Sequence, residues 1–227
     1  AGAVYSNVPS HDGIVNASQL HGKELSFNNI LDANAAWGAV SDFSEPTVAV
    51  IKHTNPCGLS SNNDLVQAYI SAYEGDPVSA FGGIVAFNRP VDEFVAIELK
   101  SIFYEIVIAP DYTSEALEVL QKKRDLRILK IADYEKFSGS NLEVRSISGG
   151  VLIQTFDDEE MDENSWQIVS ERTPTDLELL DLKFAWKVAK HVKSNAIVLT
   201  NNNSLIGMGA GQPNRVNSVH LALKAAG

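Results

Sequence analysis

The sequence is poor in cysteine, because Cys57 is the single one among 227 residues. One thiol cannot form an internal disulfide, and it leaves a cysteine-rich zinc cluster short of ligands. Disulfides are typical of exported proteins, so this cysteine usage favours a reducing compartment. We therefore expect a cytoplasmic protein that holds no zinc.

Long apolar runs are missing as well. One of the longest, residues 102–110, is interrupted by Tyr104 and Glu105 and falls far short of the roughly 20 residues that cross a bilayer. The first seven residues have neither the basic start nor the apolar core of a signal peptide. The sequence therefore predicts no membrane span and no export.

Basic residues are outnumbered, with 18 Lys and Arg against 29 Asp and Glu, which gives a formal net charge of −11 at pH 7. Such a chain repels nucleic acid and anionic membranes at long range. A phosphate-bearing ligand would have to be held by a local basic pocket. Small phosphorylated metabolites are therefore better candidate ligands than nucleic acid or a membrane.

Hydrophobic residues make up 44% of the chain and charged residues 21%, as in ordinary globular proteins. We find no repeat at a fixed period and no low-complexity tract. Short β-branched runs alternate with segments of helical periodicity, which predicts an α/β fold with a mostly parallel sheet and helices on both faces. The predicted strands are 48–51, 84–87, 106–109, 126–129, 195–200 and 205–208. The predicted helices are 29–40, 62–73, 91–103, 114–123, 175–193 and 216–226, the second of them capped by Asn62 or Asn63.

The acidic stretch 157–164 changes the composition sharply and is the best internal boundary. We expect a first unit over residues 1–156, which includes an extended or irregular lead-in over 1–24. A second unit would begin at 157. The chain ends at 227 inside a predicted helix, so this second unit looks truncated.

Lys52 and His53 follow the predicted buried strand 48–51, which we take to be parallel to its neighbours. In open α/β sheets, ligands collect at the carboxyl ends of strands. A histidine can exchange a proton near neutral pH, and an adjacent ammonium group can stabilise negative charge. The alternative is a strand-end pair without chemistry. The following turn, residues 55–58, favours the functional interpretation because it presents polar side chains on an inflexible loop.

Three weaker signals have both a structural and a functional interpretation. Cys57 could be a nucleophile activated by a nearby histidine, although a lone cysteine more often only packs. Residues 55–57 resemble half of a zinc deaminase signature, but the second cysteine is missing, so no zinc hydrolysis is expected. Phe81 could stack on a flat ring or belong to the core.

The glycine run from Gly207 to Gly211 leaves alternatives open. It could be a structural turn or a loop that cradles phosphate, since glycine allows close backbone approach and a helix follows. Arg215 beside it favours ligand binding, because arginine pairs bidentately with phosphate. A dinucleotide-dependent oxidoreductase is a weaker hypothesis, because the run departs from the dinucleotide fingerprint.

Four segments in this order resemble one known family. They are Lys-His-Thr-Asn-Pro-Cys-Gly at 52–58, Ser-Ala-Phe-Gly-Gly at 79–83, Lys-Ser-Asn-Ala-Ile at 193–197 and Gly-Met-Gly-Ala-Gly-Gln-Pro-Asn-Arg at 207–215. The family is that of the transformylase domain of bifunctional purine-biosynthesis proteins. These proteins pair a formyltransferase acting on AICAR (5-aminoimidazole-4-carboxamide ribonucleotide) with IMP cyclohydrolase. The resemblance covers residues 22–227.

The resemblance implies two cytidine-deaminase-like three-layer units, the second incomplete, and a homodimer whose active sites lie between subunits. The implied reaction is formyl transfer from 10-formyltetrahydrofolate to the 5-amino group of AICAR. No zinc is implied, whereas a monovalent cation remains compatible with the family. The resemblance also implies that this chain is a fragment with little or no activity by itself.

The resemblance further implies roles for particular residues. His53 would be the base, Lys52 would stabilise the oxyanion or protonate the departing folate nitrogen, and Asn195 would hydrogen-bond to the reacting groups. The residues that match the nucleotide pocket are Asn29, Phe81, Gly82, Glu105 and Arg215. Among these, Arg215 would bind phosphate, and Glu105 would accept hydrogen bonds from exocyclic amino groups. The alternative is a non-catalytic purine-nucleotide-binding module of the same fold.

Overall fold

A computed structural model of the chain describes residues 4–5, 13–131, 142–157 and 161–227. The described strands are β1 (Ser18–His21), β2 (Thr47–Lys52), β3 (Asn55–Ser61), β4 (Gly83–Phe87), β5 (Tyr104–Ala109), β6 (Arg127–Lys130), β7 (Leu142–Ile147), β8 (Gly150–Thr155), β9 (Ile197–Asn201) and β10 (Ser204–Gly209). The helices are α1 (Phe27–Ser41), α2 (Leu65–Glu74), α3 (Pro77–Ala80), α4 (Glu93–Leu99), α5 (Ser114–Leu120), α6 (Asp176–Lys190) and α7 (Arg215–Ala226), with 3-10 turns at Ile14–Asn16 and Glu163–Ser165.

Eight strands form one sheet in the order β1-β6-β5-β4-β2-β3-β10-β9. The prediction of a mostly parallel sheet is wrong. Only β4 with β5 and β5 with β6 pair in parallel, and the other described pairs of this sheet are antiparallel. The strand predicted at 48–51 exists as β2, but it runs antiparallel to both neighbours. A strand buried on both faces is an uninterrupted apolar run in either direction, so its sequence does not reveal the direction.

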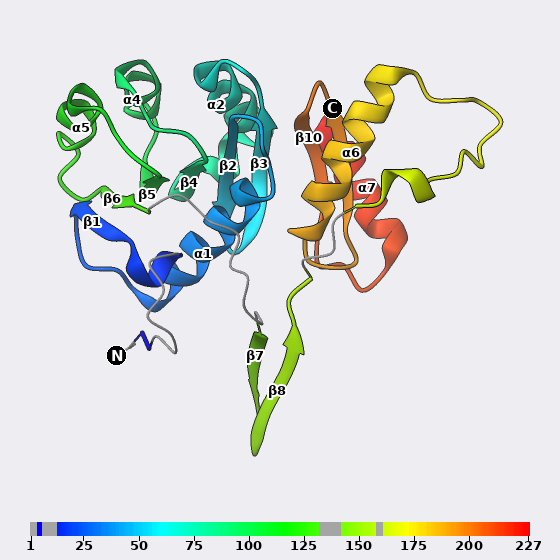
Figure 1. The fold of residues 1–227 in the computed structure, drawn as a ribbon, viewed down its shortest axis with the longest axis horizontal. Helices are drawn as coiled ribbons and strands as arrows, with labels where there is room; N and C mark the ends of the chain where they lie inside the picture. The colour runs from blue at the N-terminus through cyan, green and yellow to red at the C-terminus, as the bar shows by residue number, and fades with distance from the viewer. Residues whose placement is uncertain (1–3, 6–12, 132–141, 158–160) are drawn as a thin grey trace.

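Helices cover both faces of this sheet, as predicted. Figure 1 shows α2, α4 and α5 side by side on one face and α1 on the other. Successive residues of β2 alternate between the two cores: Val48 and Val50 pack with α2 and α4, whereas Ala49 and Ile51 pack with α1 and α6. The predicted lead-in was extended or irregular, and its described part includes an extended strand, β1, which pairs with β6.

A helix followed by a two-stranded hairpin and a second helix occurs twice, which overturns the expectation that no segment repeats. The first copy is α1-β2-β3-α2 and the second is α6-β9-β10-α7. Equivalent positions lie 149 residues apart without insertion from the helix cap to the hairpin. The pairs are the caps Ser26 and Thr175, the carboxylates Asp32 and Asp181, the tryptophans Trp37 and Trp186, and the turn residues His53–Thr54 and Asn202–Asn203.

The two hairpins lie side by side through β3 and β10. Ser60 of β3 pairs with Ser204 of β10, and their hydroxyl oxygens are 2.7 Å apart. Because these two strands are antiparallel, the turns of the two hairpins lie at opposite ends of the strands. Residues on both sides of position 157 thus contribute to one sheet, and the division into units at 156/157 stays a prediction.

The caps explain where several helices begin. Ser26 and Thr175 both form capping boxes, in which the cap hydroxyl accepts a hydrogen bond from the third helical residue, Asn29 or Glu178. The cap predicted for α2 at Asn62 or Asn63 is wrong, because Asp64 accepts from Val66 N and caps the helix. Asparagine and aspartate are both good caps, so composition alone could not choose among these three positions.

Hairpin β7-β8 stands apart from the eight-stranded sheet and extends away from the rest of the chain in Figure 1. On one of its faces, four of the six residues are apolar and exposed. That face presents Leu142, Val144, Val151 and Ile153. Among the described helices, none has the combined length and apolar character that crossing a membrane requires.

Gly58 brings β3 into contact with α2. A Cβ atom at this position would lie 1.7 Å from the carbonyl oxygen of Ala72, a backbone atom that cannot move independently. We expect Gly58→Ala to lower the free energy of unfolding by about 3 kcal/mol, as overpacking of a dense core does. Urea unfolding would measure this change.

Gly38 of α1 is the matched control, since a Cβ there would meet no atom within 4 Å. Gly38→Ala should raise the free energy of unfolding by about 0.5–1 kcal/mol through helix propensity. A Gly58→Ala protein as stable as the Gly38→Ala protein would contradict the close packing of β3 on α2.

Candidate active site

The sequence-predicted site residues gather where the strands of the eight-stranded sheet end on one side of the molecule. We call this row of strand ends the site edge. Lys52 ends β2, and the antiparallel register places it beside the start of β4, where Ile51 pairs with Ile84. The start of β5 follows, since Gly83 pairs with Tyr104. The site edge thus contains the carboxyl end of β2 but the amino ends of β4 and β5, which corrects the expectation of a site at the carboxyl ends of parallel strands.

Lys52 is held by the segment before β4. Its Nζ donates a hydrogen bond to the carbonyl oxygen of Phe81 at 2.5 Å. Gly82 has a φ of +69°, and a Cβ there would lie 3.3 Å from Lys52 Nζ, so a larger residue would strain the backbone and crowd the ammonium group. Phe81 is 62% exposed and packs against Phe103 with ring centroids 5.4 Å apart. Phe81 is therefore not a core residue, and one flank of its ring remains available.

His53 lies in the turn between β2 and β3. Lys52 pairs with Asn55, so His53 and Thr54 form a two-residue hairpin loop with φ values of +53° and +60°. The prediction of a loop at residues 55–58 is wrong, because these residues begin β3. The loop is one step earlier, and it leaves the His53 side chain exposed at the site edge.

Cys57 faces the core rather than the site edge. Its Sγ donates a hydrogen bond to Val50 O at 3.3 Å, and the residue is buried. Burial raises the pKa of the Cys57 thiol to about 12, with a further contribution from the negative charge of Asp76. A thiol that stays protonated at neutral pH is a poor nucleophile, so the packing interpretation of Cys57 is confirmed.

Asn29 and Glu105 lie near this edge but already have protein partners. The Asn29 side-chain oxygen accepts from Ser26 N at 3.0 Å as part of the α1 capping box. Glu105 accepts from Arg127 Nη1 at 2.6 Å, and Arg127 Nε donates to Glu24 O at 2.9 Å. The Arg127 pairing orients the Glu105 carboxylate, and sequence reasoning missed Arg127 because nothing local links β6 to β5.

Asn195 joins the site edge from the second copy of the repeat. Its Nδ2 donates to Gln212 O at 2.7 Å, which fixes the side-chain amide and leaves Oδ1 as its acceptor. Lys193, two residues earlier, donates from its backbone N to Asn55 Oδ1 at 3.2 Å, and its Nζ donates to the Thr54 hydroxyl. These contacts bring the segment around Asn195 to the turn that carries His53.

The glycine run does not form a nucleotide-binding loop. Gly207 and Gly209 lie inside β10, where a Cβ would approach the carbonyl oxygens of Ala222 and Ser218 of α7 to 2.3 and 2.0 Å. These glycines therefore serve close packing of a helix on a strand, and the oxidoreductase hypothesis loses its basis. Arg215 is exposed in the first turn of α7, next to the Gln212 segment that binds Asn195.

Positive charge collects at the site edge of this acidic chain. Lys52, Lys193 and Arg215 come from segments far apart in sequence, and no ion pair joins any of them to another described residue. A local basic cluster is what an anionic ligand of a chain with charge −11 requires. Across the described ranges, we find no cluster of three or more His, Cys, Asp or Glu side chains that could hold a metal ion.

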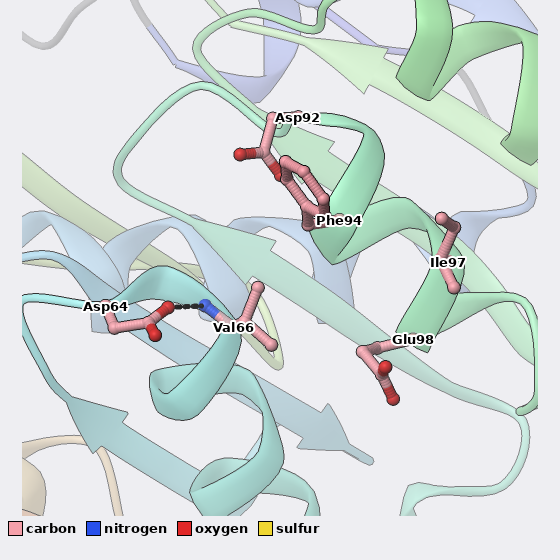
Figure 2. A pocket seen from close by; sticks show the side chains of 6 residues that line it. All are labelled: Asp64, Val66, Asp92, Phe94, Ile97 and Glu98. Carbon is pink, nitrogen blue, oxygen red and sulfur yellow. Dashed lines mark hydrogen bonds between the residues drawn. The ribbon is translucent and has the colours of Figure 1, made fainter.

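Two surface pockets are relevant to the location of a ligand. A pocket of about 220 Å³ at the site edge is lined by Asn28, Leu31, Asp32, His53 and Thr54. A larger groove of about 400 Å³ lies between α2 and α4, where Asp64 accepts from Val66 N and Asp92 caps α4 (Figure 2). The groove contains none of the predicted site residues, so the site edge is the better candidate.

Comparison with known proteins identifies close relatives. A sequence model of the AICARFT/IMPCHase bienzyme family matches residues 1–225. A bifunctional purine biosynthesis protein PurH from Thermoanaerobacter sp. (strain X514) is 51% identical over 226 residues, which are 99% of this chain and 44% of the relative. PurH proteins from Bacillus mycoides (strain KBAB4) and Enterococcus faecalis (strain ATCC 700802 / V583) are 53% and 50% identical and cover 93% and 97% of this chain. The chain spans less than half the length of these relatives.

Proposed function

Because the chain belongs to the AICARFT/IMPCHase bienzyme family, we propose that it carries the formyltransferase centre of a bifunctional purine-biosynthesis protein. The substrates are AICAR and 10-formyltetrahydrofolate, and the formyl group moves to the 5-amino group of AICAR. The observation that supports this proposal most directly is the convergence of Lys52, His53, Asn195 and Arg215 at one basic edge of the sheet.

His53 acts as the general base. As the amine of AICAR attacks the formyl carbon, the imidazole accepts one of its protons, so the new C–N bond forms without a charged ammonium product. The bond between the formyl carbon and the folate nitrogen then breaks, and that nitrogen receives a proton. The exposed position of His53 on a two-residue turn gives its ring access to a bound amine.

Lys52 stabilises the negative charge that develops on the formyl oxygen during attack, or supplies the proton to the departing folate nitrogen. Its ammonium group is anchored by Phe81 O and points along the site edge next to Gly82. A donor fixed before reaction needs little reorganisation when charge develops. Asn195, whose amide is held through Gln212 O, hydrogen-bonds to the reacting groups.

The remaining family positions bind the nucleotide. Arg215 pairs with the 5′-phosphate, since it is exposed and has no described carboxylate partner. Phe81 stacks on the imidazole ring, and Glu105, oriented by Arg127, accepts from the exocyclic amino groups. Gly82 keeps space for the Lys52 ammonium, and Asn29 lines the nucleotide pocket from the first turn of α1.

The repeated helix-hairpin-helix unit supports a fold of two cytidine-deaminase-like units. The first covers residues 1–156, and the second begins at residue 157. We further propose a homodimer whose active sites lie between subunits, because the site edge is open and shallow within one chain, with a pocket of only about 220 Å³, below the roughly 300–1,000 Å³ typical of small-molecule sites.

The test uses the full-length protein that carries this sequence, AICAR and 10-formyltetrahydrofolate. We expect tetrahydrofolate to be released only when AICAR is present, and absorbance measures this release. A reaction without AICAR is the control. Calorimetry on the same protein measures AICAR binding. Binding without any release of tetrahydrofolate would refute the formyltransferase and support the non-catalytic nucleotide-binding module.

A further inference from the structure

The turn that carries His53 has a conformation that its own sequence does not favour. A two-residue hairpin with positive φ at both positions is a type I′ turn, for which Asn-Gly and similar pairs are preferred. His53 and Thr54 occupy these positions instead. A β-branched residue at positive φ is a genuine outlier, and such residues persist only where surrounding structure holds them.

Contacts from outside the hairpin hold this turn. Asp32 of α1 accepts a hydrogen bond from Thr54 N at 2.7 Å, and Lys193 Nζ donates to the Thr54 hydroxyl. The Thr54 hydroxyl in turn donates to His53 O at 2.7 Å, and Asn55 Nδ2 donates to the same oxygen at 3.1 Å. The backbone of His53 is thus fixed through its neighbours, and a carboxylate acceptor makes the Asp32 bond a strong one.

In the second copy of the repeat, an equivalent carboxylate holds an equivalent turn, but that turn contains no histidine. Asp181 of α6 accepts from Asn203 N at 2.7 Å and from Asn202 N at 3.1 Å. The turn residues there have φ values of +52° and +52°. Asparagine tolerates this conformation far better than threonine, and this turn lies at the edge of the sheet opposite the site edge.

We propose that Asp32 is a positioning residue for His53: by accepting from Thr54 N, it holds the strained turn so that the imidazole faces the site edge. The inference rests on the proposed function, in which His53 is the base. Asp32 lines the same small pocket as His53 and Thr54, and it touches no reacting atom in this role. In the second copy, Asp181 only stabilises a turn that carries no base.

Three variants of the full-length protein separate positioning from general stability. Asp32→Ala removes the acceptor, and we expect kcat to fall roughly tenfold to a hundredfold, as small misplacements of a catalytic group do, while KM for AICAR stays within about twofold of the unsubstituted value. Asp32→Asn keeps an oxygen acceptor of the same reach and should restore most of kcat. Asp181→Ala removes the equivalent bond at the other turn and should leave kcat unchanged.

Amide hydrogen exchange provides a readout that does not depend on turnover. The Thr54 amide should lose protection in Asp32→Ala and keep it in Asp32→Asn, and Asn203 should lose protection only in Asp181→Ala. If Asp32→Ala fails to fold, Asp32→Ser carries the same expectation, because serine is too short to reach Thr54 N.

The outcomes distinguish this inference from the proposed function. An Asp32→Ala protein that loses Thr54 protection but keeps full kcat overturns the positioning role, as does an Asp32→Asn protein as slow as Asp32→Ala. An equal loss of kcat in Asp181→Ala would also overturn it, because stability alone would then explain the effect. If the unsubstituted protein shows no formyl transfer, the proposed function fails, and the catalytic role of Asp32 fails with it.

Discussion

Replacing His53 with alanine in the full-length protein should lower kcat for formyl transfer by about 10²–10⁴-fold, the usual contribution of a general base. The amine of AICAR must lose a proton as it attacks, and the exposed imidazole of His53, in the turn next to Lys52, is the candidate acceptor of that proton. The protein should still fold, because the His53 side chain is exposed and carries no core packing. Steady-state rates and a melting curve on the same preparation would measure both effects.

His191 supplies the matched control for this substitution. Its Nε2 lies 2.8 Å from Asp42 Oδ2, so it ties the end of α6 to the residue that follows α1. Burial raises the pKa of Asp42, but the hydrogen bonds and charges of His191 and Lys190 outweigh burial and hold that pKa below its usual value. His191→Ala should therefore reduce stability and spare kcat. A His53→Ala protein that turned over like the His191→Ala protein would refute the assignment of the base.

Replacing Lys52 with methionine should lower kcat by about 10²–10³-fold, the usual loss when one donor to a developing oxyanion is removed. Methionine has a similar length but neither charge nor donor, so the substitution removes the bond to Phe81 O together with the ammonium. Lys52→Arg keeps the charge but changes its geometry, so it should recover only part of the rate. Initial rates at saturating AICAR and folate would measure the change in kcat.

Lys130 is the control for the loss of one lysine charge. It ends β6, away from the site edge, and its Nζ forms an exposed ion pair with Asp111 at 2.6 Å. Lys130→Met should change stability by less than about 1 kcal/mol, as exposed pairs do, and should leave kcat unchanged. If Lys52→Met lost no more activity than Lys130→Met, the assignment of Lys52 as the donor to the formyl oxygen would be refuted.

The element types could be predicted from local sequence over much of the chain. Periodicity placed α1 and α6 within a few residues of their observed bounds, and the strands predicted at 195–200 and 205–208 overlap β9 and β10. These features depend on neighbours within one or two turns, such as the cap hydroxyl of Thr175 and the helix it begins. The ordered motifs also identified the family, which the comparisons confirm.

The internal repeat was present in the sequence but was missed. Leu31-Asp32 and Ala36-Trp37 recur as Leu180-Asp181 and Ala185-Trp186, 149 residues later. Few positions are identical in the two copies, and even an identical residue has different surroundings: Trp37 is buried, whereas Trp186 is 63% exposed. The equivalence becomes plain from the order of the elements and from the hydrogen bonds that Asp32 and Asp181 accept from the two turns.

By itself, the sequence determined the family, the kinds of elements and the side chains that can exchange protons or bind phosphate, because these follow from local chemistry. Tertiary structure decided the strand directions and the meeting of Lys52 and His53 with Asn195 and Arg215 at one edge, since contacts between distant residues select among locally equivalent strands. It also decided the left-handed turn at His53, because His-Thr does not favour that conformation and Asp32 holds it from another element.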